Sequence, residues 1–214
     1  NKTYKSPIIL ISTLKLLIAH MKKLKFKMKI KIINHEDINR YNLNNKCINL
    51  INLKLNLTND LKKITNKSNS FIENSFNIAL KLIKLGTTNQ MINGPISKKN
   101  FLNKKYLGIT EYLAKKSNTK KIAMLIYNEE LSVCPITTHL PLKRVTKKIT
   151  KEKIYEKVNL ITNFYKNYRN KKPKIAILGL NPHCESIDKV NEDETITKPA
   201  VKYLKKKGYN VSGP

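Results

Sequence analysis

The apolar positions of this chain recur with two periods, one typical of strands and one typical of helices. Residues 7–11 form an apolar run that predicts a buried strand, and residues 13–24 follow with apolar positions at helical spacing. In residues 28–33 lysine alternates with methionine and isoleucine, which predicts a second strand. The chain therefore opens with a predicted β-α-β unit.

The middle of the chain gives one strong helical signal. Residues 34–68 are rich in asparagine, and we interpret them as short strands and loops. Residues 70–85 predict an amphipathic helix ending at Gly86, with apolar positions at Phe71, Ile72, Phe76, Ala79, Leu80, Leu82 and Ile83. Residues 90–92 predict a strand that runs into a Gly-Pro turn and then a helix.

The second half of the chain alternates strands with helices. Residues 122–126 and 132–137 predict neighbouring strands, and their short polar connection indicates a hairpin. Thr150 is placed to cap a helix over 151–168. The remaining predicted elements are a strand at 174–180, a helix at 191–207 and a strand at 209–211. This order predicts an α/β fold with a largely parallel or mixed sheet and flanking helices.

Composition narrows the class of protein. The 214 residues suit one large domain or two small ones, and 40% of them are hydrophobic, which is enough for a core. No stretch reaches the roughly 18 uninterrupted apolar residues of a membrane span. Three scattered cysteines favour a reducing compartment over a disulfide framework. We therefore expect a cytoplasmic protein with no membrane partner.

The formal net charge of +29 raises the question of a nucleic-acid partner. Lysines occur in every segment alongside many isoleucines and asparagines, whereas nucleic-acid-binding proteins are expected to cluster basic residues, often among aromatic ones. A compositional bias acting on the whole chain explains this pattern, so we expect no nucleic-acid partner. Steering of an anionic, for example phosphorylated, substrate stays open, as does basic nucleic-acid binding.

Two of the four histidines, His139 and His183, each follow a predicted strand at a polar turn beside a proline. Ligands of α/β proteins bind at the carboxyl ends of strands, and neutral imidazole is the commonest metal ligand. The pair is therefore a candidate site for a divalent metal such as zinc, cobalt, magnesium or manganese. Two unrelated polar turns are the alternative.

Two further segments contain residue types found in ligand sites. Residues 94–98 resemble an anion-binding turn, because backbone N–H groups at a helix start, together with Lys98, can hold a phosphate. The alternative is an ordinary Gly-Pro turn that binds no ligand, because such turns are common. Thr110 opens a predicted helix, where its hydroxyl caps the first turn or reaches a ligand.

Taken together, these segments resemble the 4-hydroxythreonine-4-phosphate dehydrogenase family of pyridoxal phosphate biosynthesis. The resemblance keeps order and spacing through Gly-Pro-Ile-Ser-Lys at 94–98, Gly-Ile-Thr-Glu-Tyr-Leu-Ala at 108–114, Thr-Thr-His-Leu-Pro-Leu at 137–142, Gly-Leu-Asn-Pro-His at 179–183 and Gly-Tyr-Asn-Val-Ser-Gly-Pro at 208–214. The third and fourth motifs together are highly specific. The match is weakest between residues 34 and 68.

The resemblance implies an isocitrate/isopropylmalate dehydrogenase-like fold and a homodimer. It implies NAD-dependent oxidation, with decarboxylation, of 4-phosphooxy-L-threonine to 3-amino-2-oxopropyl phosphate. His139 and His183 match two of the family's metal-binding histidines, and Thr110 matches a substrate-binding threonine. Lys98 is carried over as a contact to substrate or cofactor. NAD, a divalent metal and a phosphorylated small molecule are thus the expected ligands.

The chain departs from the family pattern in four places. Ile109 stands where the family has a histidine, and the loop after His183 is one residue shorter than usual. The family's Gly-rich opening is not found, and its third metal-binding histidine would come after Pro214. We therefore expect residues 1–214 to be an incomplete portion of one dehydrogenase chain. Its approximate lobes would be 1–95 and 96–214, and it would show no turnover on its own.

These departures keep two alternatives open beside nucleic-acid binding. Because isoleucine cannot donate a hydrogen bond, Ile109 is compatible with a related dehydrogenase of phosphorylated four-carbon sugar acids, such as 4-phosphothreonate or erythronate phosphate. Ile109 and the shortened loop are also compatible with a degenerate, non-catalytic paralogue.

Overall fold

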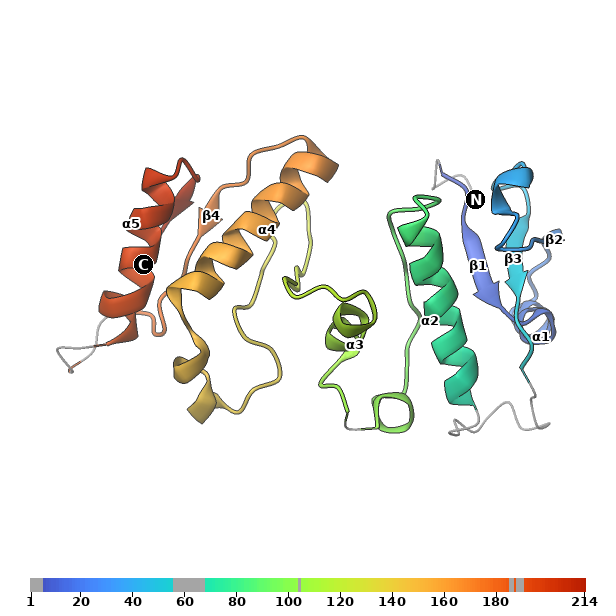
Figure 1. Cartoon of the computed structure of the whole chain (residues 1–214), viewed down its shortest axis with the longest axis horizontal. Helices are drawn as coiled ribbons and strands as arrows, with labels where there is room; N and C mark the ends of the chain where they lie inside the picture. Colours follow the sequence, from blue (N-terminus) through green and yellow to red (C-terminus); the bar gives the residue numbers. More distant parts are fainter. Residues whose placement is uncertain (1–5, 56–67, 104, 185–186, 188–190) are drawn as a thin grey trace. The chain divides into compact units, whose positions relative to one another are not determined.

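The computed structural model describes residues 6–55, 68–103, 105–184, 187 and 191–214, in two compact units. The first unit is Asn1–Gly108 and the second is Ile109–Pro214 (Figure 1). The expected lobes, 1–95 and 96–214, stay a prediction. In the described part of the chain, no helix is both long enough and apolar enough to cross a membrane.

A parallel sheet forms the base of the first unit. Its elements, in chain order, are β1 (Ile9–Ser12), α1 (Leu14–Lys23), β2 (Ile30–Ile32), the short helix η1 (Ile38–Arg40) and β3 (Ile48–Asn52). The strand order is β1-β3-β2, with Ile9 opposite Asn49 and Ile30 opposite Ile48. Because α1 connects two strands that run parallel to β3, the predicted β-α-β opening is confirmed. Within the Asn-rich segment, residues 56–67 lie outside the described residues.

The helix α2 (Asn69–Lys84) packs beside β1 (Figure 1). Its Leu82 is buried in a cluster with Ile33, Ile38 and Ile51, so apolar positions at helical spacing meet the inner face of the sheet. Gly86, with φ of 72°, follows the helix in a left-handed conformation that glycine adopts without steric cost. The helix predicted at 70–85 is confirmed.

The strand predicted at 90–92 is wrong. These residues have no strand pairing in the structure, and Ile92 is 87% exposed. A strand needs a neighbour to accept its hydrogen bonds, and a short apolar run alone does not supply one. The helix predicted after the Gly-Pro turn is present as the π-helical turn η3 (Lys98–Leu102), which Ser97 caps by accepting from the Asn100 N–H.

The described residues of the second unit form helices and one strand pair. Its elements are α3 (Ile109–Lys116), η4 (Leu142–Arg144), η5 (Thr146–Lys148), α4 (Lys151–Arg169), β4 (Ile175–Ala176), η6 (Asp193–Thr197), α5 (Lys198–Lys206) and β5 (Val211–Ser212). β4 and β5 pair in parallel. Ile154 and Val158 of α4 are buried against Val201 and Leu204 of α5, which forms the core of this unit.

The strands of the second unit are shorter than predicted. The hairpin expected over 122–137 is reduced to one antiparallel bridge between Ile126 and Val133, and the strand expected at 174–180 narrows to β4. Ile126 and Val133 are 63% and 52% exposed, so no further strand covers them among the described residues. The helix expected at 191–207 is present, with η6 as its first turn.

Candidate functional site

His139 lies in an irregular turn that connects the bridge residue Val133 to η4. Its side chain is exposed, and its backbone has φ of 57°, a left-handed conformation that is uncommon for residues other than glycine. Such strained residues cluster at functional sites. The turn therefore presents the imidazole to its surroundings at a local cost in backbone energy.

A side-chain hydrogen bond ties this turn to the start of α3. The Thr138 hydroxyl donates to Glu111 Oε1 at 3.3 Å, and Glu111 lies in the first turn of the helix. Its neighbour Thr110 is half-buried. Because α3 begins at Ile109, Thr110 lies inside the helix and is not its cap, which corrects the capping interpretation. One hydrogen bond thus joins Glu111, the neighbour of Thr110, to Thr138, the neighbour of His139.

His183 lies in a turn that follows β4. Asn181 shapes this turn with its side chain and its backbone: Oδ1 accepts from the His183 N–H at 2.9 Å, and the carbonyl oxygen accepts from the Cys184 N–H at 3.1 Å. Cys184 has φ of 54°, and the His183 side chain is exposed. Asparagine side chains favour such local turns, so the motif itself dictates this geometry.

A buried carboxylate lies directly behind the His183 turn. Asp193 of η6 is 3% exposed, and its Oδ2 accepts from the Leu180 N–H at 3.1 Å. Gly179 makes room for it, because a Cβ atom at that position would lie 2.9 Å from Asp193 Oδ2 and 2.6 Å from Cys184 Sγ. A side chain at position 179 would therefore displace the side chains of Asp193 and Cys184.

Lys98 belongs to the first unit, whereas Thr110, His139 and His183 belong to the second. Its side chain is exposed at the start of η3, directly after the cap residue Ser97. This position fits the anion-binding turn predicted at 94–98. No described contact assigns Lys98 to a ligand, so its role stays a prediction.

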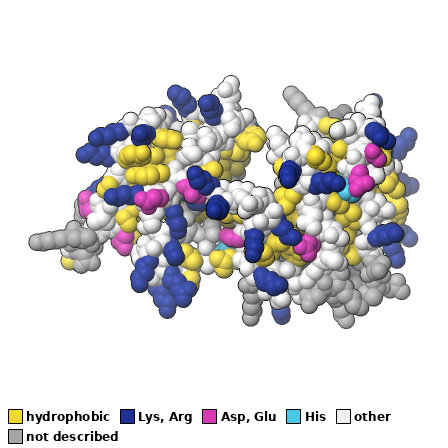
Figure 2. All heavy atoms as spheres, in the orientation of Figure 1, with side chains coloured by type: hydrophobic (Ala, Val, Ile, Leu, Met, Phe, Trp, Pro, Cys, Tyr) yellow, Lys and Arg dark blue, Asp and Glu magenta, His cyan; other side chains and the backbone are white. Residues whose placement is uncertain are grey.

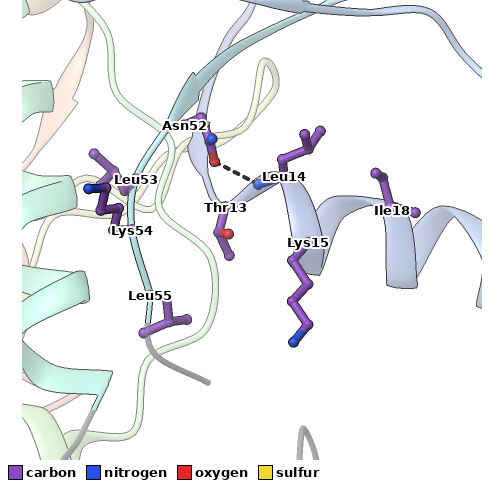
Figure 3. A pocket seen from close by; sticks show the side chains of 8 residues that line it. All are labelled: Thr13, Leu14, Lys15, Ile18, Asn52, Leu53, Lys54 and Leu55. Carbon is purple, nitrogen blue, oxygen red and sulfur yellow. Dashed lines mark hydrogen bonds between the residues drawn. The ribbon is translucent and has the colours of Figure 1, made fainter. Parts of the chain in front are cut away.

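An open pocket of about 590 Å³ lies in the first unit, where β1 and β3 end and α1 begins (Figure 3). Its lining includes Lys15 and Lys54, which would favour an anion. Asn52 Oδ1 accepts from the Leu14 N–H at 2.8 Å and so already occupies part of the helix N-terminus. None of the predicted site residues lines this pocket.

On the one face that Figure 2 draws, positive charge is spread and not gathered in a single patch. On the face that Figure 2 shows, lysine and arginine side chains lie over both units, with acidic and apolar side chains between them. No single basic stripe stands out on that face. The picture agrees with a compositional bias.

The histidines supply suitable donor atoms for a metal ion, but not a full set. Imidazole nitrogen binds zinc and related divalent ions, which commonly take three protein ligands in catalytic sites. In the described part of the chain there is no group of three or more histidine, cysteine, aspartate or glutamate side chains placed to hold a metal. A shared metal site at His139 and His183 therefore stays a prediction.

Curated proteins similar to this chain carry one name. A protein named 4-hydroxythreonine-4-phosphate dehydrogenase from Sulfurihydrogenibium sp. is 40% identical over 171 residues, which are 78% of this chain and 52% of that protein. A protein of the same name from Aquifex aeolicus is 44% identical over 110 residues, covering 51% of this chain and 34% of its own length. The chain thus spans about half the length, or less, of these relatives.

Solved structures of the same fold carry this name too. The 4-hydroxythreonine-4-phosphate dehydrogenase from Klebsiella pneumoniae matches 100% of this chain and 67% of its own with a TM-score of 0.83 at 24% identity. That from Burkholderia phymatum matches 96% of this chain and 63% of its own with a TM-score of 0.75 at 25% identity. The fold of this chain is therefore of the α/β, isocitrate dehydrogenase-like type.

The profile of the family described as pyridoxal phosphate biosynthetic protein PdxA matches residues 4–214. The chain belongs to this family, so the resemblance predicted from the sequence is confirmed.

Sequence reasoning missed two carboxylates that contact the histidine turns, Glu111 and Asp193. Glu111 stands in a recognised motif beside Thr110, but its contact with Thr138 spans 27 positions and cannot be seen in the sequence. Asp193 is one of 14 acidic residues in a chain with 43 basic ones, and nothing in the sequence distinguishes it from the others. Only the structure shows that its side chain is buried.

Proposed function

We propose that this protein, in its complete natural form, is a cytoplasmic, NAD-dependent dehydrogenase that acts as a homodimer. It would oxidise and decarboxylate 4-phosphooxy-L-threonine to 3-amino-2-oxopropyl phosphate in pyridoxal phosphate biosynthesis. The observation that carries the proposal is the hydrogen bond between Thr138 and Glu111. It connects the turn that carries His139 to the first turn of the helix that carries Thr110.

The proposed roles follow from the chemistry of each side chain. His139 and His183 would hold a divalent ion, which supplies Lewis-acid polarisation of the substrate hydroxyl when bound. The Thr110 hydroxyl has no hydrogen bond among the described residues, so it is free to bind substrate. Lys98 would contact the phosphate of substrate or cofactor.

A second candidate function is favoured by Ile109, which is the first residue of α3 and half-buried beside Thr110. It removes a hydrogen-bond donor from the motif, so a substrate with a different anionic group is compatible with this site. The alternative is oxidation of phosphorylated four-carbon sugar acids by the same residues.

Kinetics on the complete protein test the proposal. NADH or NADPH formation is followed with 4-phosphooxy-L-threonine, 4-phosphothreonate and erythronate phosphate as substrates, before and after removal of metal by a chelator. We expect metal-dependent turnover that is fastest with 4-phosphooxy-L-threonine and NAD. Faster turnover of a sugar acid would favour the second function, and no turnover of any substrate would favour a degenerate paralogue.

A further inference from the structure

A carboxylate contacts each histidine turn and accepts a hydrogen bond there through one of its two oxygen atoms. Glu111 Oε1 accepts from Thr138, while its Oε2 is buried with no hydrogen-bond partner among the described residues. Asp193 Oδ2 accepts from the Leu180 N–H, while its Oδ1 is buried and likewise unpartnered within that part of the chain. A buried oxygen without a partner loses its hydration and gains no hydrogen bond in return. A buried carboxylate oxygen of this kind lies at both turns, which suggests that the two carboxylates have a role at the turns.

We infer that Glu111 and Asp193 are positioning residues that fix the two turns from which His139 and His183 reach a metal ion. The inference rests on the proposed function, because it requires the two histidines to be ligands. Residues that orient metal ligands without touching the metal typically change metal affinity about 10- to 100-fold when they are mutated.

Asp193 acts on the backbone of its turn. Its bond to the Leu180 N–H holds the residue that directly precedes Asn181, whose side chain and carbonyl shape the turn around His183. A hydrogen bond to a carboxylate is about twice as strong as one between neutral groups. Because Gly179 leaves no side chain between them, the carboxylate lies directly behind the turn.

Glu111 acts through a side chain of its turn. Glu111 accepts a hydrogen bond from the hydroxyl of Thr138, the residue before His139. The left-handed backbone of His139 persists only if its surroundings stabilise it. Glu111 also lies in the first turn of α3, where a negative charge is favoured by the helix dipole. One carboxylate therefore fixes the His139 turn to the helix that carries Thr110.

Metal titration of variants of the complete protein tests both residues. We expect Glu111→Ala and Asp193→Ala to weaken Zn²⁺ affinity about tenfold or more, measured by competition with a chelator. Glu111→Gln and Asp193→Asn keep an acceptor oxygen and should stay within about threefold of wild type. The matched control is Glu194→Gln, which removes the same charge from an exposed side chain paired with Lys198. Wild-type affinity in both alanine variants would overturn the inference, as would equal losses in the alanine and amide variants.

Amide hydrogen exchange of the metal-free protein separates this inference from the proposed function. We expect Asp193→Ala to speed exchange at Leu180 through Cys184 only, and Asp193→Asn to restore protection. Unchanged exchange, in a protein whose metal affinity falls in His183→Ala, overturns the positioning role alone. Wild-type metal affinity in His183→Ala overturns the proposed metal function and, with it, the inference.

Discussion

At the scale of single residues, both histidine turns contain a left-handed backbone at a residue other than glycine. His139 has φ of 57°, and Cys184, which follows His183, has φ of 54°. This conformation costs an L-residue roughly 1–2 kcal/mol, because Cβ comes too close to the following carbonyl oxygen. Asparagine or glycine would adopt this conformation at lower cost, and the proposed metal-binding role of the imidazole would explain the histidine at position 139.

Glycine at position 139 separates the strain from the function. We expect His139→Gly to be more stable than His139→Ala by about 1 kcal/mol, because glycine adopts positive φ without a clash. Urea unfolding of the two variants measures this difference. Both variants should lose metal affinity to the same extent. A more stable alanine variant would show that the left-handed turn is absent in solution.

Ile109 is the position at which we propose that substrate preference is decided. We expect Ile109→His to lower KM for 4-phosphooxy-L-threonine about tenfold, since a hydrogen bond to a charged group contributes about 1.5–3 kcal/mol. Ile109→Leu is the control, because it keeps an apolar side chain and should leave KM unchanged. If the histidine variant has the KM of wild type, another residue already supplies that contact.

At the scale of elements, signals local to the sequence predicted the helices well. The helix predicted at 151–168 is Lys151–Arg169, and Thr150 caps it by accepting from the Lys153 N–H at 3.3 Å. Periodicity and caps depend on residues within one or two turns. The strands expected at 90–92 and across 122–137 depend on distant partners, which the pattern does not contain, and so these predictions were wrong or too long.

Thr150, which caps α4, also forms a hydrogen bond with the side chain of Glu152 in the first turn of the helix. The pKa of Glu152 is lowered first by its own backbone N–H and then by the Thr150 hydroxyl. Because the folded pKa lies below the unfolded value, this contribution to stability is present above the unfolded pKa and is lost as pH falls through the folded pKa.

We therefore expect Thr150→Ala to raise the pKa of Glu152 and to lower the free energy of unfolding by about 1 kcal/mol near neutral pH. Carboxyl NMR titration and urea unfolding measure the two effects. Thr150→Ser keeps the hydroxyl and is the matched control. An alanine variant with the same Glu152 pKa as the serine variant would contradict the capping pair.

At the scale of the whole molecule, the family assignment accounts for the motifs and does not depend on the charge of +29. The sequence contained His139, His183 and Thr110 as recognisable motif positions. Glu111 and Asp193 escaped it, because their importance lies in burial and in contacts over 27 and 13 positions. Local motifs thus predicted the candidate ligand residues, and only the fold revealed the carboxylates that contact their turns.

The spread of basic residues predicts weak, non-specific contact with nucleic acid. We expect binding of this protein to a DNA or RNA duplex to disappear by physiological salt, as for a purely electrostatic contact. Fluorescence anisotropy over a salt series measures it. Tight binding that survives physiological salt would revive a nucleic-acid function.

We propose that His139 and His183 hold one metal ion beside the substrate. A crystal structure of the complete protein with divalent metal and 4-phosphooxy-L-threonine tests it most directly. We predict one imidazole nitrogen from each histidine about 2.0–2.1 Å from the same ion, as is typical of zinc, with Thr110 in contact with the substrate. An ion bound with neither histidine as a ligand would contradict the account.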